Sequence, residues 1–143
     1  MRHLYNHLAD RLAAWVPPDV LALAARFGIG ATFWLSGRTK VDGWLHVTDG
    51  AVALFRDEFR LPLLPPELAA HLAAYAEHLF PLLLFLGLFT RGAALALLGM
   101  TLVIQVFVYP DAWPTHLSWA AIFLGLMRHG AGRASLDHLL GLR

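Results

Sequence analysis

The first sixteen residues alternate apolar and polar positions with the period of an α-helix. Apolar side chains recur at spacings of four, four and three residues, at Leu4, Leu8, Leu12 and Trp15. Charged residues such as Asp10 fall between them, so we expect an amphipathic helix that lies in a membrane interface. Because Asp10 interrupts the segment and no long apolar stretch begins before Val20, it does not resemble a secretory signal. Pro17 and Pro18 are expected to end the helix.

Beyond this segment the chain contains four long, mostly apolar stretches. They cover residues 20–36, 68–89, 92–109 and 114–128. A membrane-spanning helix needs about 20 apolar residues, so the pattern predicts an all-α, polytopic membrane four-helix bundle, formed by a single domain over residues 1–143. The fourth stretch is the shortest and must be extended at its ends or cross a thinner part of the bilayer. Thr90-Arg91-Gly92 leaves so short a connection that the second and third helices are expected to be antiparallel neighbours.

The longest polar stretch separates the first two spans and runs from Arg38 to Pro66. Within it, the residues from Asp49 to Phe59 could form a short helix with apolar side chains on one side. We expect this helix to lie on the surface or to cap the bundle. Near the end of the chain, a glycine-containing turn leads to Ser135, which is a good N-cap for a short amphipathic terminal helix.

The composition indicates a membrane protein and excludes several functions. Of the 143 residues, 58% are hydrophobic and 15% are charged, whereas soluble domains carry about 25% charged residues. The net charge of +1 provides no basic field for a nucleic-acid backbone, so DNA and RNA are not expected as partners. The chain has no cysteine, which excludes disulfides, thiolate metal sites, iron–sulfur ligation and a nucleophilic thiol.

The distribution of basic residues predicts the orientation of the spans, because cytoplasmic loops are enriched in Lys and Arg. With the N-terminus inside, the cytoplasmic side would hold Arg2, Arg11, Arg91, Arg128, Arg133 and Arg143. The outer side would hold Arg38, Lys40, Arg56 and Arg60. This modest bias, together with aromatic residues that gather near one interface, predicts that both termini are cytoplasmic.

Three ionisable residues lie at membrane depth, well inside the predicted spans: Arg26, Glu77 and His78. Each costs at least roughly 2.5 kcal/mol at the centre of a spanning helix, so each requires a reason to be there. At 1.5 Å per residue, Arg26 and Glu77 lie about 10 Å and about 18 Å from the inner end, an offset that the two side chains can bridge. In a structural interpretation they pair, or Arg26 extends toward the inner surface, and helices are held together. In a functional one, Glu77 carries a proton or binds a ligand and Arg26 tunes it.

The second span has two unusual faces. A polar stripe is formed by Glu67, His71, Tyr75 and His78, which lie within roughly 80° of one another on a helix. Because such a stripe is costly against lipid, we expect it to face the bundle interior or a wet cavity open to the outer side. The adjacent face has small residues beside Glu77, where another helix could approach closely. These small residues are Ala70, Ala73 and Ala74.

Polar residues elsewhere could complete an outward-opening pocket with this stripe. They are Trp34, Lys40, Thr101, Gln105, Tyr109 and His116. The candidate ligand-binding residues are therefore Arg26, Lys40, His71, Tyr75, Glu77, His78, Gln105, Tyr109 and His116.

A metal site or a known catalytic motif is not indicated. His71 and His78 are about 10.5 Å apart along a helix axis, whereas zinc ligands lie about 2 Å from the metal. These two residues cannot share one ion, and a site would require another histidine, such as His116 beside His71. The chain contains no His-Glu-x-x-His motif, Walker loop, Gly-x-Ser-x-Gly elbow or dinucleotide fingerprint. We therefore predict no catalytic residue and no metal ligand.

Three blocks of the chain carry a resemblance to a known family. The first runs from Arg26-Phe27-Gly28 to Lys40, the second from Glu77 to Arg91, and the third from Gly130 to Asp137. In this order and spacing, over roughly residues 20–140, the chain resembles the DoxX family of small four-helix membrane proteins. The resemblance implies a multi-pass protein of the bacterial inner membrane. Family members tend to be accessory, as a membrane subunit in thiosulfate:quinone oxidoreduction or as a membrane partner of soluble redox and stress-defence enzymes.

Several functions fit these observations. Residues 46–64 and 100–110 resemble a branch associated with bacterial operons for metal-related peptide modification. The leading hypothesis is an accessory or anchoring subunit of a redox or metal-stress system that binds a quinone or another small hydrophobic ligand. Its expected partners are the lipid bilayer and either a second copy or a protein encoded nearby. The alternatives are a small proton or solute transporter and a purely structural assembly module.

Overall fold

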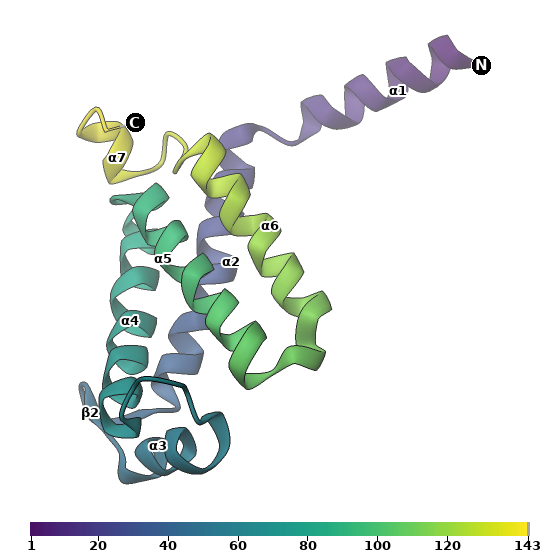
Figure 1. Cartoon of the computed structure of the whole chain (residues 1–143). Helices are drawn as coiled ribbons and strands as arrows, with labels where there is room; N and C mark the ends of the chain where they lie inside the picture. Colours follow the sequence, from purple (N-terminus) through teal and green to yellow (C-terminus); the bar gives the residue numbers. More distant parts are fainter. Residues whose placement is uncertain (143) are drawn as a thin grey trace.

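The computed structural model describes residues 1–142, and helices dominate it (Figure 1). The first half contains α1 (Arg2–Trp15), α2 (Pro18–Arg38), β1 (Val41–Asp42), β2 (His46–Val47), α3 (Asp49–Leu54) and the π-helical segment η1 (Phe55–Phe59). The second half contains α4 (Pro66–Leu86), α5 (Thr90–Val103), the π-helical segment η2 (Ile104–Val108), the 3₁₀ turn η3 (Pro110–Ala112), α6 (Trp113–His129) and α7 (Leu136–Leu139). Arg143, one of the cations expected on the cytoplasmic side, lies outside the described residues.

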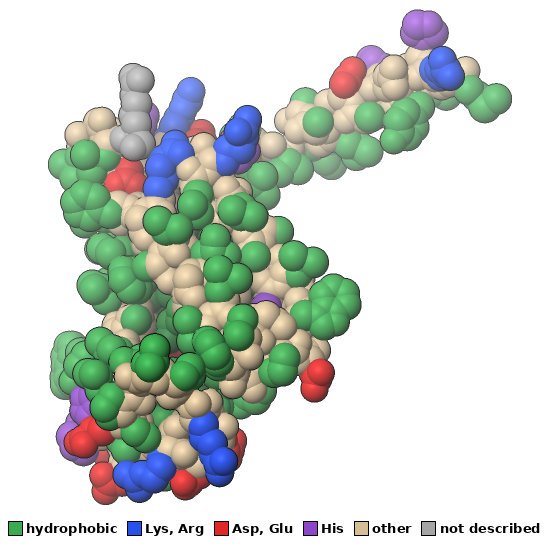
Figure 2. Space-filling model, in the orientation of Figure 1, with side chains coloured by type: hydrophobic (Ala, Val, Ile, Leu, Met, Phe, Trp, Pro, Cys, Tyr) green, Lys and Arg blue, Asp and Glu red, His purple; other side chains and the backbone are tan. Residues whose placement is uncertain are grey.

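Within residues 1–142, three helices are long and apolar enough to cross a bilayer: α2, α4 and the continuous helix formed by α5 and η2. Hydrophobic side chains cover the middle of the bundle, whereas the charged side chains gather at its two ends (Figure 2). This is the surface of a multi-pass helical membrane protein in contact with lipid, and the predicted all-α membrane fold is confirmed. The 17 residues of α6 extend only about 26 Å, so a fourth crossing stays a prediction.

The short connection between the second and third spans lies three residues earlier than expected. Gly87, with φ +63°, ends α4 in a left-handed conformation, and Thr90 already begins α5. The two helices pack as antiparallel neighbours, as predicted (Figure 1). The end of the bundle that holds the start of α2, this connection and α7 is termed the inner end. The opposite end, with β1, β2, α3 and η3, is termed the outer end.

The buried apolar side chains form two clusters. The bundle core comprises Ile29, Phe33, Leu84, Ala93, Ala94, Leu97, Phe123 and Leu126, from α2, α4, α5 and α6. A second cluster joins the outer segment to the start of α4, and it comprises Val41, Val47, Ala51, Phe55, Ala69, Ala70 and Ala74. The short helix predicted over residues 49–59 therefore exists and caps the outer end of the bundle.

A small hairpin in the outer segment was not predicted. Strands β1 and β2 pair antiparallel, with Val41 opposite Val47 and Asp42 opposite His46. Its sequence signal is the Asp42-Gly43 pair, since Asp-Gly is a common hairpin turn and Gly43 adopts φ +53°. The hairpin turns the chain back after α2 and so brings Lys40 to the surface of α4.

Candidate functional site

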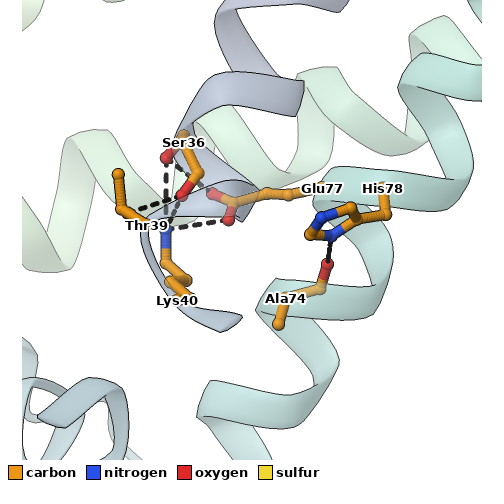
Figure 3. A network of polar contacts seen from close by, with 6 residues as sticks. All are labelled: Ser36, Thr39, Lys40, Ala74, Glu77 and His78. Atoms are coloured by element: carbon orange, nitrogen blue, oxygen red, sulfur yellow. Dashed lines mark hydrogen bonds and ion pairs between the residues drawn. The ribbon is translucent and has the colours of Figure 1, made fainter. Parts of the chain in front are cut away.

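A buried polar network joins α2 to α4 near the outer end (Figure 3). The ammonium of Lys40, just after α2, lies 2.8 Å from Oε2 of Glu77 on α4. Ser36 donates from Oγ to Oε1 of the same carboxylate at 3.1 Å. Lys40 also donates to the carbonyl oxygen and Oγ of Ser36, at 3.2 and 3.1 Å. Glu77 is only 2% exposed and Lys40 8%, so this ion pair replaces the water that both charges have lost.

The network depends on a close approach of α2 to α4. A Cβ on Gly37 would lie 2.9 Å from Cβ of Glu77 and 2.9 Å from Cε1 of His78, so only glycine fits there. On α4, Ala70 and Ala74 are fully buried in the cluster shared with the outer segment, and Ala73 lines a cavity. The predicted close approach of another helix is therefore confirmed beside Glu77, where α2 packs against α4.

His78 lies beside this contact without joining the network. Its Nδ1–H donates to the carbonyl of Ala74 at 2.6 Å, and its ring meets that of Trp34 edge-on at 4.9 Å. With Nδ1 as the donor, Nε2 carries a lone pair, and it has no hydrogen-bond partner among the described residues. His78 thus presents an unused acceptor inside the bundle.

A cavity of about 280 Å³ adjoins the network. Ser36, Lys40 and Glu77 form its polar end, and Tyr109 also lines it. The other walls are apolar and come from α4, from the segment η1 to residue 64, and from α5 and η2. They are Phe55, Phe59, Leu61, Leu64, Ala69, Leu72, Ala73, Ala76, Met100, Val103, Ile104 and Val108. The site therefore combines a hydrophobic chamber with one charged, hydrogen-bonding end.

The other candidate residues lie away from this cavity. Tyr75 and Glu67 are exposed, and His71 donates to the carbonyl of Glu67 at 2.8 Å. The expectation that the stripe Glu67, His71, Tyr75 and His78 faces the interior is therefore wrong for all but His78. The reason is that α2 packs on α4 at Glu77 and His78 and the outer segment packs on Ala70 and Ala74, which leaves the rest of the stripe facing outward.

Gln105 and His116 also stay outside the cavity, because they bind each other. The imidazole Nδ1 of His116 lies 2.6 Å from Oε1 of Gln105, whose Nε2 donates to the carbonyl of Pro110 at 2.7 Å. Thr101 is buried and donates to the carbonyl of Leu97 at 2.8 Å. The Gln105–His116 pair connects η2 to α6, whereas the Thr101 bond stays within α5. Within residues 1–142, no cluster of three or more His, Asp or Glu side chains is arranged to hold a metal ion.

Arg26 has a different role from the pairing proposed for it with Glu77. Its guanidinium donates to four carbonyl oxygens: Leu84 at 2.7 Å, and Phe85, Ala131 and Ala134 at 2.8 Å each. The predicted Arg26–Glu77 pair is wrong, because Glu77 packs beside Gly37 whereas Arg26 lies beside the end of α4, about 17 Å away along α2. The alternative, in which Arg26 extends toward the inner end and holds segments together, agrees with these contacts. A cation at the C-terminal carbonyls of a helix is favourable.

The same inner end holds further contacts between distant segments. The carboxylate of Asp137 accepts from the backbone N–H groups of Phe89 and Thr90, at 2.7 and 3.0 Å, and so caps α5. Arg91 donates to the carbonyls of Met127 and Arg128 at the end of α6. One part of each of the three sequence blocks that carry the family resemblance thus lies at the inner end.

A hollow of about 630 Å³ lies among these inner residues, and its lining includes Asp19, Arg91, Arg133 and Asp137. The charges of this lining balance, and each already has a partner within the chain, since the Asp19 carboxylate accepts from the backbone N–H of Arg133 at 2.8 Å. Ser135 caps α7 as predicted, by accepting from the N–H of His138 at 3.2 Å. The polar groups at this end therefore hold the fold together.

The sequence predicts three of the four polar residues that line the cavity, Lys40, Glu77 and Tyr109, but not Ser36. A small polar residue four positions before Lys40, near the end of a predicted helix, was the available signal, because i and i+4 side chains lie on one face.

Comparison with known proteins agrees with this architecture. The DoxX family model matches residues 21–110. A protein of Haemophilus influenzae (strain ATCC 51907 / DSM 11121 / KW20 / Rd), described as uncharacterized, is 31% identical over 133 residues, which cover 85% of this chain and 83% of the relative. No solved structure matches. Since the family match covers well over half of the sequence, the chain belongs to the DoxX family.

Proposed function

We propose that this protein is an accessory or anchoring subunit of a redox or metal-stress system in the bacterial inner membrane, with both termini in the cytoplasm. Its specific contribution is to bind a quinone, or a similar small lipid-soluble molecule, in the outer cavity. The observation that carries this proposal is the buried Ser36–Lys40–Glu77 network at the end of an otherwise apolar chamber. A protein with only a structural need for the ion pair has no use for the chamber.

The chemistry of the cavity matches that of a quinone. The apolar walls suit the ring and the isoprenoid chain, while the carbonyl oxygens of the head group need hydrogen-bond donors. Lys40 can supply one donor, because its bonds to Ser36 are long and exchangeable. The hydroxyl of Tyr109, which also lines the cavity, can supply another. The carboxylate of Glu77 beside Lys40 can accept a hydrogen bond from a hydroxyl group of the reduced form of the head group.

The rim of the cavity favours a ligand that arrives through the membrane. Leu72 and Val103 line the cavity and are also 51% and 41% exposed on the lipid-facing surfaces of α4 and α5. A volume of about 280 Å³ lies just below the range of about 300–1,000 Å³ typical of ligand pockets. The head group therefore fits inside, and a long tail would leave between these two side chains into the bilayer.

Ligand binding is tested on purified full-length protein in lipid nanodiscs. Decylubiquinone is titrated while tryptophan fluorescence is recorded, and lipid extracts are analysed for co-purified quinones by mass spectrometry. Ala73→Leu fills the cavity without touching the polar network and is expected to weaken binding by about tenfold. Ala121→Leu, on the exposed side of α6, is the matched control and should bind like the wild type.

Two results would contradict this proposal. One is the absence of both a co-purified lipid-soluble molecule and a saturable response to decylubiquinone. The other is equal binding by the Ala73→Leu and Ala121→Leu variants, which would place any interaction outside the cavity. Uptake driven by a pH gradient in liposomes would favour the transport alternative instead.

The accessory role is tested separately from ligand binding. We expect a second copy or a protein encoded beside this one to associate with it in the membrane. Native mass spectrometry of the nanodisc complex measures this association. The activity of the neighbouring enzyme in a strain carrying Ala73→Leu measures whether that enzyme depends on the cavity. Unchanged enzyme activity in that strain would remove the link between the cavity and the redox system.

A further inference from the structure

Helix α1 is a large structural element outside the bundle. None of its fourteen residues is buried against any other part of residues 1–142, and the helix projects from the inner end (Figure 1). An isolated helix of this length is marginal in water, because most helix stability in proteins comes from packing of an apolar face. The helix therefore needs a surface that covers that face.

The position of α1 restricts what this surface can be. Only Val16 and Pro17 separate its last residue, Trp15, from the first residue of α2. Two residues extend at most about 7 Å. Since α2 is long and apolar enough to cross the bilayer, the end of α1 is held at the membrane surface where α2 enters.

Helix α1 has an apolar side and a polar side, as a helix lying at a membrane surface requires. Four of its exposed apolar residues lie within an arc of roughly 80° on the helix, and the exposed ring of Tyr5 extends this arc to roughly 100°. The four are Leu4, Leu8, Leu12 and Trp15. Asn6 and Asp10 lie on the opposite side. In Figure 2 hydrophobic side chains follow the lower edge of the helix, toward the level of the apolar bundle, whereas its acidic and histidine side chains lie along the upper edge.

The charges at this end fit a phospholipid surface. Arg91, Arg128 and Arg133 are exposed at the inner end, where Asp19 and Asp137 are partly exposed. Helix α1 adds Arg2 and Arg11 against Asp10, so basic residues outnumber acidic ones at this end. Anionic headgroups attract such basic residues near a membrane. The apolar arc provides insertion into the boundary between headgroups and acyl chains, and the charges add attraction to the same leaflet.

We propose that α1 is an interfacial anchor that lies flat on the leaflet at the inner end of the bundle, with Leu4, Leu8, Leu12 and Trp15 inserted and Asp10 facing water. Its partner is the phospholipid surface of the membrane that the bundle crosses. This anchor adds a second, peripheral attachment to the membrane and fixes the inner end at the level of the headgroups. The proposal does not depend on ligand binding in the outer cavity.

Site-directed labelling tests this proposal without interference, because the chain contains no cysteine. Full-length Leu8→Cys and Asp10→Cys variants are spin-labelled in nanodiscs of phosphatidylethanolamine and phosphatidylglycerol. Collisions with oxygen, which concentrates in lipid, and with a water-soluble nickel chelate are then measured. The ratio of oxygen to nickel collisions is expected to be several-fold higher at Leu8 than at Asp10. Extending the scan from residue 4 to residue 15 should give a helical period.

Two outcomes would overturn the proposal. Equal access of the nickel chelate to both labels would mean that α1 projects into water. Efficient cross-linking of Leu8→Cys between two copies, with the label equally protected in lipid and in detergent, would mean that a second copy covers the apolar face. The thermal unfolding midpoint of the labelled variants serves as the folding control and is expected to be unchanged, since neither side chain contacts the bundle.

Discussion

The inner and outer ends of the bundle both bury charge between α2 and α4, but they do so differently. At the inner end, the Arg26 guanidinium donates hydrogen bonds to four backbone carbonyls, two of which lie in a loop more than one hundred residues away in the sequence. At the outer end, Lys40 and Glu77 mainly satisfy each other through side chains, beside a cavity. Backbone carbonyls cannot exchange partners without unfolding, whereas side chains can. The comparison indicates a fastening at the inner end and a site at the outer end.

The largest effect is expected at Arg26, whose removal tests the fastening. Arg26→Ala removes a donor from four carbonyls, of which that of Leu84 still accepts from the N–H of Gly87. Each buried carbonyl left unpaired costs about 1–3 kcal/mol. Because some of these groups will find water, we expect a loss of about 3–5 kcal/mol in the free energy of unfolding, close to the cost of breaking a buried ion pair. Chemical denaturation in detergent micelles measures it.

Two further variants make the test of Arg26 specific. Arg26→Lys keeps the charge but loses the planar fork of donors, so it should rescue only a small part of the stability. Arg11→Ala, on the exposed helix α1, should change the free energy of unfolding little. A normal stability for Arg26→Ala would mean that the inner contacts do not fasten the bundle.

A smaller effect is expected at the helix contact beneath the outer network. Gly37→Ala would place a Cβ 2.9 Å from Cβ of Glu77, so α2 and α4 must separate at a cost of about 1–3 kcal/mol. On the same helix, Gly28→Ala is the matched control, since no described atom lies within 4 Å of its Cβ. It should be neutral, or stabilising by up to about 1 kcal/mol through helix propensity. Thermal unfolding compares them, and equal midpoints would argue against a tight helix contact.

The smallest effect is expected at Asp137, which caps α5 from a distant segment. Asp137→Ala removes the acceptor for two backbone N–H groups, and loss of a helix cap costs about 1 kcal/mol. His138→Ala, at the exposed neighbouring position, should leave the unfolding midpoint unchanged. Because the cap belongs to the inner end, Asp137→Ala should retain quinone binding. Loss of binding in this variant would remove the distinction between the two ends.

The sequence was sufficient for the parts of the fold that depend on local pattern. The apolar stretches, the amphipathic segment before Pro17 and the cap at Ser135 follow from period and composition, and each was predicted. The partners of Arg26 were not, because backbone carbonyls of Ala131 and Ala134 leave no mark in the sequence. The contact of Gly37 with Glu77 fixes how far α2 is shifted along α4. Counting residues from the helix ends gives the depth of each residue but cannot reveal this contact.

The candidate site was predictable to a similar extent. Lys40, Glu77 and Tyr109 were assigned to a pocket because each is polar and lies in or near the outer part of a span. The predicted direction of the polar stripe was wrong. The face of α4 that is buried is the one with Ala70, Ala74 and Glu77, and close packing rather than polarity determines this. The chamber itself depends on η1 and η2, whose π-helical geometry has no recognised sequence signal.

The central claim, that the outer end holds a ligand site and the inner end does not, is tested most directly by the affinity for decylubiquinone of variants altered at either end. The double variant Lys40→Gln/Glu77→Gln removes both outer charges together, so neither is left buried alone, and it is measured beside Asp137→Ala in the same nanodiscs. Loss of a charged hydrogen bond predicts a dissociation constant at least about tenfold higher for the outer variant, with Asp137→Ala unchanged. Unchanged affinity in the outer variant, or an equal loss in both, would contradict the assignment of the site to the outer end.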